Sequence, residues 1–215
     1  MKKNKGSAAQ GKHFECHPLT RGRWGDFEEL FGSRGACGGC WCMSWRLPRK
    51  EFNARKGEGN RQAMKALVES GVVPGLLGYL DGCPVGWCSL APREQFPALA
   101  RSRVLQPVDN QPCWSVSCLF VQRSCRNQGV ATLLLGAAVE YVKGKDVSFL
   151  EGYPVEPWVG KPIPAAFAWT GVPKVFAANG FREVLRRSTT RPIMRFDFRM
   201  VRRQGGSQKK EEMIR

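Results

Sequence analysis

The chain has 215 residues, of which 42% are hydrophobic, and a formal net charge of +16. This length suits one sizeable core, and no apolar run is long enough to cross a membrane as a helix. Residues 1–15 begin with basic side chains but contain no apolar stretch after them, so a secretory signal peptide is not expected. These features argue against a secreted protein and against a membrane partner.

Positive charge is concentrated at the two ends of the chain. Residues 1–23 contain six Lys/Arg and one Glu, and residues 182–215 contain eleven Lys/Arg and four Asp/Glu. A basic surface attracts polyanions such as RNA and also speeds the capture of polyphosphate cofactors. The alternative is a pair of solubilising tails and an edge strand protected by Arg.

The hydrophobic pattern predicts alternating helices and strands. After a polar N-terminal arm, the first half is expected to contain a helix (23–31), a Gly/Cys/Trp-rich loop or strand (33–45), a helix (60–70), two strands (75–80 and 84–90) and a short helix (92–104). The second half is expected to contain a strand (113–121), a helix (129–142), a strand (147–151), a Pro-rich connection (152–170), a helix capped by Thr170 (170–179) and two strands (181–185 and 193–198). This order predicts a mixed α/β protein.

The junction between the strand that ends at Val121 and the next helix carries the strongest functional signal. It reads Arg126-Asn127-Gln128-Gly129-Val130-Ala131-Thr132. The first N–H groups of a helix lack intrahelical partners and carry partial positive charge, so consecutive amides here can hold a phosphate or diphosphate. Gly129 allows close approach of the backbone, and Arg126 adds a charged, forked donor. The alternative is an ordinary turn with a solvated Arg.

These residues resemble the acyl-coenzyme A signature of the GNAT family of N-acetyltransferases. In that signature a strand ending in Val is followed by four residues, Arg or Gln, two residues, Gly, one residue and Gly or Ala. Val121, Arg126, Gly129 and Ala131 occupy these places. The order of elements over residues 20–198 is also similar to that of GNAT domains, and the segment 175–181 resembles the family's helix-to-strand ending.

The resemblance implies a mixed α+β sheet whose central pair of parallel strands splays apart, with helices on its faces. It implies one acetyltransferase domain at 21–198, a basic flexible arm at 1–20 and a basic flexible tail at 199–215. Acetyl-coenzyme A is the implied co-substrate, and no metal is expected. The implied cofactor-binding residues are Leu119, Phe120, Val121, Arg126, Asn127, Gln128, Gly129, Val130, Ala131, Thr132 and Phe176.

Acyl transfer from a thioester to an amine requires stabilisation of an oxyanion and movement of protons. The resemblance implies that the N–H of Leu119 points at the thioester oxygen. GNAT enzymes often carry a Tyr four residues before the Gly of the helix-to-strand ending, but this chain has Phe176 there. Tyr153 is the nearest substitute as a proton donor, and Glu151 is the candidate base. The alternative for Glu151 and Tyr153 is a strand-end pair that satisfies loop backbone.

The nine cysteines are an odd number and are expected to be reduced thiols of a cytoplasmic protein. The segment 37–42 has the C-x₂-C spacing of zinc sites, with Cys16 and His17 as further candidate ligands, but it lacks a second matched pair. Redox chemistry is another alternative. As the loop between the first two helices, which borders the acceptor site in the family, it is expected to present Trp41 and Trp45 as an apolar wall or to pack in the core.

The principal prediction is an N-acetyltransferase that transfers an acetyl group from acetyl-coenzyme A to a primary amine of a small molecule or protein, by direct attack in a ternary complex. One alternative is an acyltransferase that uses an aminoacyl-tRNA and follows the RNA with its basic ends. Another is a non-catalytic GNAT-fold binding module, which Phe176 favours. No acidic cluster indicates a polyamine or aminoglycoside acceptor, and the acceptor and oligomeric state stay open.

Overall fold

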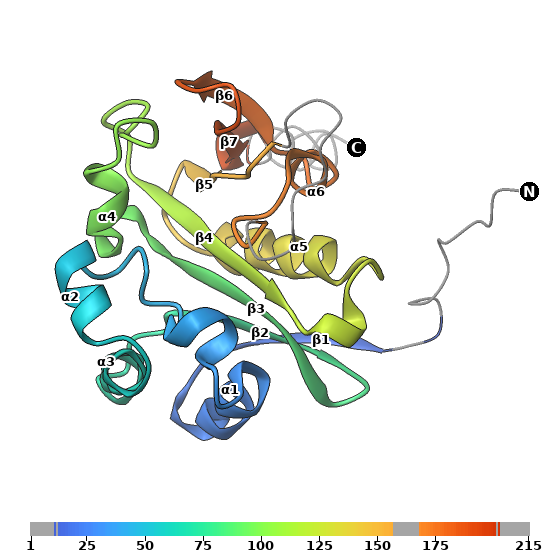
Figure 1. Cartoon of the computed structure of the whole chain (residues 1–215). Coiled ribbons are helices and arrows are strands. Elements are labelled where there is room, and N and C mark those ends of the chain that lie inside the picture. The colour runs from blue at the N-terminus through green and yellow to red at the C-terminus, as the bar shows by residue number, and fades with distance from the viewer. Residues whose placement is uncertain (1–10, 12, 157–167, 201, 203–215) are drawn as a thin grey trace, which may run out of the picture.

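The computed structural model describes residues 11, 13–156, 168–200 and 202 (Figure 1). Its strands form one sheet in the order β1-β2-β3-β4-β5-β7-β6, in which only β4 and β5 are parallel neighbours. The strands are β1 (Phe14–Pro18), β2 (Gly75–Leu80), β3 (Cys83–Pro92), β4 (Cys113–Val121), β5 (Phe149–Gly152), β6 (Arg182–Arg186) and β7 (Pro192–Asp197). The predicted mixed α/β fold is therefore confirmed.

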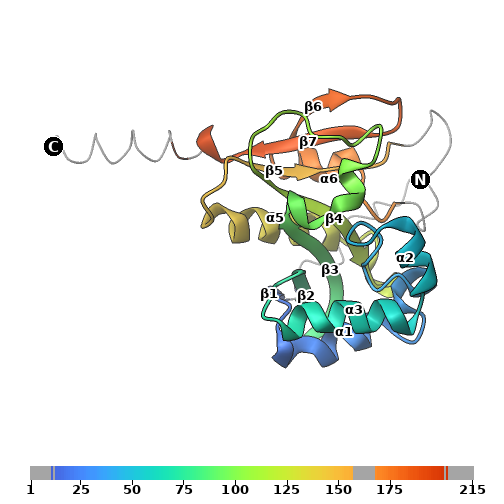
Figure 2. The same ribbon diagram turned by 90° about the vertical axis from the view of Figure 1, so that its left-hand side faces the viewer.

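Helices cover both faces of this sheet. They are α1 (Trp24–Phe31), α2 (Arg49–Ala54), α3 (Glu58–Glu69), α4 (Pro97–Ala100), α5 (Val130–Lys143) and α6 (Pro173–Ala177). Figure 1 shows α5 and α6 on one side and α1, α2 and α3 on the other, and Figure 2 shows β6 and β7 at the opposite end of the sheet from β1. Within the described ranges, no helix combines the length and the hydropathy needed to cross a bilayer.

Each face of the sheet has its own core, because side chains of a strand alternate between faces. On the α5 face, Leu119 of β4 packs with Leu134 and Leu135, both fully buried. On the other face, Trp87 of β3 packs against Phe27 of α1, with ring centroids 4.9 Å apart. The spacing of apolar residues that predicted α1 and α5 is thus the spacing that points into these cores.

The central strands β4 and β5 separate part of the way along β4. They pair only from Cys113 to Val116 of β4, although β4 continues to Val121. At this point β4 contains an extra residue, Ser117, because Cys118 pairs with Ser89 of β3 while Val116 pairs with the next residue. Such a bulge bends a strand, so the far half of β4 leaves β5. This is the splayed parallel pair that the family resemblance implied.

The structure differs from the predicted boundaries at several places, among them the helix expected at 92–104, of which only α4 (Pro97–Ala100) is an α-helix. The expected arm at 1–20 contains β1, which pairs with β2 at the sheet edge, so the domain begins earlier than residue 21. Helix α2 was not predicted, since its six residues bury no apolar stripe. Thr170 does not cap a helix, because α6 begins after Val172 with Pro173, a residue that suits the first helical turn. Most of the predicted arm and tail lies outside the described residues.

Candidate active site

The turn before α5 presents a row of backbone amides. Two residues with left-handed backbone, Asn127 (φ 60°) and Gly129 (φ 85°), shape it. In the described part of the chain, no acceptor pairs with the N–H groups of residues 127–131, and the first paired amide is that of Thr132, which donates to the Gly129 carbonyl at 2.9 Å. Free amides at the start of a 14-residue helix attract anions.

Side chains brace this turn from both sides. Nε of Arg126 donates to the carbonyl of Val121 at 2.9 Å, which ties the end of β4 to the turn. Among the described residues, neither Nη group of Arg126 has a partner, so both remain available as donors. The side-chain amide of Gln128 donates from Nε2 to the Ser124 carbonyl at 2.9 Å. Val130 is buried beneath the turn and Ala131 is half-buried, so the exposed side of the turn is mainly backbone.

The amide of Leu119 is not free in this structure. It donates to the carbonyl of Trp169 at 2.7 Å, so the connection that follows β5 occupies this part of the open edge of β4. A buried N–H group is costly without a partner, and β5 has already separated from β4 at this height. The expectation of an unoccupied oxyanion donor at Leu119 is therefore corrected, and Arg126 likewise already occupies the Val121 carbonyl.

Glu151 lies in a buried ionic network rather than at an open cleft. Its carboxylate accepts hydrogen bonds from Arg93 Nη1 at 3.1 Å, Arg195 Nε at 2.8 Å and the Tyr153 hydroxyl at 2.7 Å. The Glu151 side chain is only 1% exposed. Burial raises the pKa of Tyr153 far above its usual range. Among the described residues, both side chains thus bond other side chains, whereas the alternative role left by the sequence was to satisfy loop backbone.

The position of this network also separates it from Leu119. Glu151 pairs in register with Ser115, which lies four residues before Leu119 on β4. At about 3.3 Å per residue, these two points of the strand are about 13 Å apart. Glu151 therefore does not reach an amine at Leu119 directly, and a base must be found elsewhere.

Phe176 is a core residue. It is fully buried, and its ring packs against the main chain at Gly152, where an added Cβ would lie 2.6 Å from its Cδ1 and closer still to Cε1. Its other edge faces Gly171. The place at which the family resemblance implies a Tyr is thus filled by a side chain without a hydroxyl.

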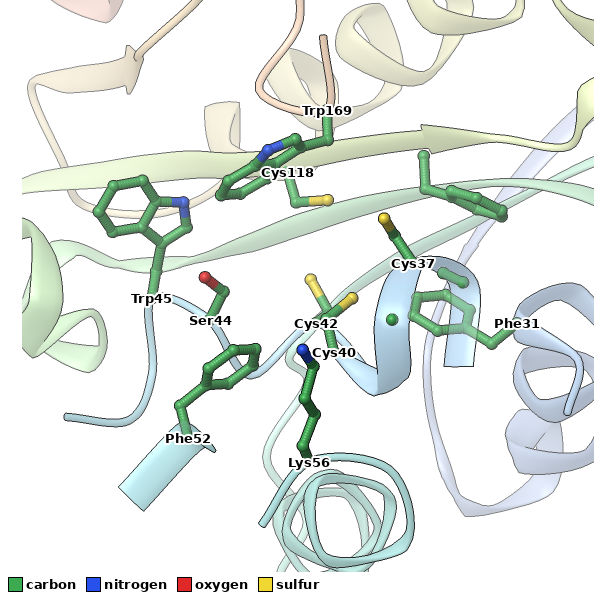
Figure 3. Close-up of a pocket in the computed structure, with 13 residues that line it drawn as sticks. Phe31, Cys37, Cys40, Cys42, Ser44, Trp45, Phe52, Lys56, Cys118 and Trp169 are labelled. Carbon is green, nitrogen blue, oxygen red and sulfur yellow. The ribbon is translucent and has the colours of Figure 1, made fainter. Parts of the chain in front are cut away.

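A cavity of about 290 Å³ opens on the face of the sheet opposite α5, the face to which Cys118 and Phe120 of β4 point (Figure 3). The predicted loop between α1 and α2 forms one wall of this cavity. Trp45 lines it as expected, whereas Trp41 packs in the core on Phe31, with ring centroids 5.7 Å apart. Sequence reasoning missed the further lining residues Phe52, Lys56, Cys118 and Trp169.

Four thiols line the same cavity, those of Cys37, Cys40, Cys42 and Cys118 (Figure 3). The indole N–H of Trp87 donates to the Cys42 sulfur at 3.0 Å. The hydrogen bond from Cys118 lowers the pKa of the Cys42 thiol below its usual range, against the opposing effect of burial. Among the described residues, no group of three or more His, Cys, Asp or Glu is arranged to hold a metal ion.

Cys42 is therefore expected to react with a small alkylating reagent at lower pH than an ordinary thiol. Donors to its sulfur stabilise the thiolate, so the charged form persists as the pH falls below the usual cysteine pKa of about 8.5. Peptide mapping by mass spectrometry after timed iodoacetamide exposure gives the pH of half-maximal rate. Cys118→Ala should move this pH upward. An unchanged value would show that Cys118 does not stabilise the thiolate.

A sequence model of the acetyltransferase (GNAT) family matches residues 42–154, more than half of the chain. The chain therefore belongs to the GNAT family of acetyltransferases. No curated protein matches it.

Solved structures are similar to this chain, and the first of the three that follow shares its fold. Aminoglycoside N-acetyltransferase AAC(6')-Iy in complex with CoA is 15% identical with a TM-score of 0.50, covering 85% of this chain and 96% of that one. PaiA N-acetyltransferase from Thermoplasma acidophilum in complex with coenzyme A is 13% identical with a TM-score of 0.48, covering 86% and 99%. An N-acetyltransferase from Staphylococcus aureus Mu50 is 11% identical with a TM-score of 0.49, covering 86% and 99%.

Proposed function

We propose that this protein is an acetyl-coenzyme A-dependent N-acetyltransferase that acetylates a primary amine of a small molecule or protein in a ternary complex. The observation that supports the proposal most strongly is the row of free amides at residues 127–131, beside the two free Nη groups of Arg126. These groups suit the diphosphate of coenzyme A. The nine free thiols suit a reducing compartment such as the cytoplasm.

The residues divide into those that hold the co-substrate and those that meet the amine. Acetyl-coenzyme A would supply the activated acetyl group, with its diphosphate at residues 127–132 and Arg126. The backbone groups of Leu119 and Val121 face the edge where β4 has left β5, which suits the pantetheine arm, whereas those of Phe120 face β3. The amide of Leu119 can serve an oxyanion only after its bond to the Trp169 carbonyl opens.

Proton transfer in this proposal does not depend on Glu151 or Tyr153. Both are buried in the ionic network, and Phe176 has no hydroxyl. Among the described residues that line the cavity, none is a carboxylate or a histidine. The amine would therefore arrive in its neutral form, with water taking and returning protons.

Arg126→Ala is expected to weaken binding of acetyl-coenzyme A about tenfold or more, because a hydrogen bond to a charged group contributes about 1.5–3 kcal/mol. Isothermal titration calorimetry measures the affinity, and release of free thiol in the presence of an amine panel measures turnover. Acetyl-pantetheine lacks the diphosphate, so its binding should be unaffected by the substitution.

Two control pairs separate this effect from damage to the fold. Arg123→Ala removes a neighbouring exposed Arg outside the turn and should leave the affinity unchanged. Gly129→Asp and Gly129→Asn tolerate the left-handed backbone similarly, but only Asp places a negative charge beside the diphosphate. Equal affinity in Arg126→Ala, Gly129→Asp and the unaltered protein would refute the coenzyme A site. Strongly salt-dependent binding of aminoacyl-tRNA instead would favour the RNA-dependent alternative.

A further inference from the structure

The walls of the cavity are largely aromatic. Trp45 and Trp169 face each other from different segments with ring centroids 5.8 Å apart. On the other side, Phe31 and Phe120 lie 5.5 Å apart. Phe52 also lines the space. A volume of about 290 Å³ is at the lower end for ligand pockets, so the cavity suits an apolar body of roughly one aromatic ring.

One charged side chain lines this apolar space in the described chain, and it is a cation. Figure 3 shows the amino group of Lys56 directed toward the cavity. The neighbouring carboxylates are already paired. Oε1 of Glu51 lies 2.9 Å from Nη2 of Arg55, and Oε1 of Glu58 lies 2.7 Å from Nη1 of Arg61. The charge of Lys56 is thus uncompensated by its neighbours in sequence, which favours an anionic ligand group.

The backbone beside Lys56 is held in place against the loop of segment 35–43. The Gly57 amide donates to the Gly39 carbonyl at 3.0 Å, and the Asn60 side-chain amide donates to the same carbonyl at 3.1 Å. This contact is close enough that a Cβ on Gly39 would lie 2.5 Å from the Gly57 nitrogen. Lys56 is therefore attached to a fixed point of the cavity rim.

The loop of segment 35–43, which contacts the backbone beside Lys56, has a conformation that costs free energy. Ala36, Trp41 and Cys42 have positive φ angles of 65°, 41° and 56°. For residues other than glycine such angles cost about 1–3 kcal/mol each, and they concentrate at binding sites. Cys42 also brings its thiol to the cavity, and the buried cation of Arg46 contributes to the lowered pKa of that thiol. The rim cation of Lys56 consequently remains available to a ligand.

We propose that the acceptor is an amine with an aromatic body and a second, anionic group, of which a carboxylate is the simplest, and that Lys56 binds this group. The inference rests on the proposed acetyltransferase function. A cation at the rim repels ammonium groups, so it disfavours polyamines and keeps a bound amine in its neutral, nucleophilic form. The aromatic walls contribute affinity, and Lys56 contributes selectivity.

Three amines built on one ring test the proposal. They are 4-(aminomethyl)benzoate, benzylamine and 1,4-bis(aminomethyl)benzene, which carry a carboxylate, no second group and a second amine. The expected order of kcat/KM falls from the first to the last. Lys56→Met should lower kcat/KM for the carboxylate about threefold to fivefold, through KM, and leave benzylamine unchanged, as is typical of an exposed ion pair.

Charge reversal and a remote lysine provide the controls. Lys56→Glu should make the diamine better than the carboxylate. Lys50→Met removes an exposed Lys that does not line the cavity and should change nothing. Equal use of the three amines by the unaltered protein, or an equal effect of Lys56→Met on all three, would overturn the proposal.

Binding without catalysis distinguishes this proposal from the acetyltransferase proposal. The titration of 4-methylbenzoate, which has no amine, reports on the cavity alone, and the titration of acetyl-coenzyme A reports on the turn at residues 127–131. A threefold to fivefold weaker affinity for 4-methylbenzoate in Lys56→Met supports the anion site whether or not turnover is seen. An unchanged affinity in Lys56→Met overturns the proposed role of Lys56, while intact acetyl-coenzyme A affinity would leave the enzyme assignment standing.

Discussion

Glu151→Gln is expected to lower the free energy of unfolding by about 3 kcal/mol. The substitution keeps the shape of the side chain but removes the charge that Arg93 and Arg195 share in the interior. Arg195 retains Asp109, with contacts of 2.6 and 2.9 Å, whereas Arg93 keeps only uncharged partners. Chemical denaturation followed by circular dichroism measures the loss.

An exposed ion pair in the same sheet provides the control. Glu183 pairs with Arg186 on β6, where both side chains are partly exposed, so Glu183→Gln should cost less than about 1 kcal/mol. Adding Arg93→Gln to Glu151→Gln should restore part of the stability, because it removes the uncompensated charge. If Glu151→Gln kept full stability and lost turnover with a changed pH profile, Glu151 would be a catalytic base after all.

Gly152→Ala is expected to destabilise the fold by about 2–3 kcal/mol. The new methyl group would overlap the ring of Phe176, which is fully buried and packs between Gly152 and Gly171. Gly152 is also the last residue at which β5 pairs with β4, so the ring cannot move aside without disturbing the start of the splay. Thermal and chemical unfolding measure the cost.

Gly144→Ala is the matched control, because a Cβ at that residue meets no atom within 4 Å and its φ of −78° suits any residue. The free energy of unfolding of Gly144→Ala should be unchanged or slightly raised. Gly152→Ala combined with Phe176→Leu should lose less stability than the sum of the two single variants, since Leu leaves room for the methyl group. Strict additivity would show that the ring and Gly152 do not compete for the same space.

Local patterns were sufficient to predict the part of the site made from one stretch of chain. The strand to Val121, the turn with Arg126 and Gly129, and the start of α5 all lie where the sequence places them, because helix ends and glycine turns are set by neighbours along the chain. The parallel pair β4 and β5 was implied by the family resemblance.

Contacts between distant segments could not be predicted in this way. Neither the carbonyl of Trp169 at the Leu119 amide nor the two Arg partners of Glu151 leaves any periodic signal in the sequence. Lys56 lines the cavity only because Gly57, which follows α2, contacts Gly39, which precedes α2. Such partners depend on tertiary packing, whereas spacing rules describe only a single element.

The extra residue Ser117 has a consequence beyond bending β4. Before Ser117, the even-numbered residues Trp114 and Val116 face α5. After it, the odd-numbered residues Leu119 and Val121 face α5. Only for that reason do Cys118 and Phe120 point into the cavity. A regular strand with the same sequence would exchange the two surfaces beyond Val116 and would turn Leu119 toward the cavity in place of the Cys118 thiol, whereas deletion of Ser117 would remove the bulge and leave both surfaces unchanged.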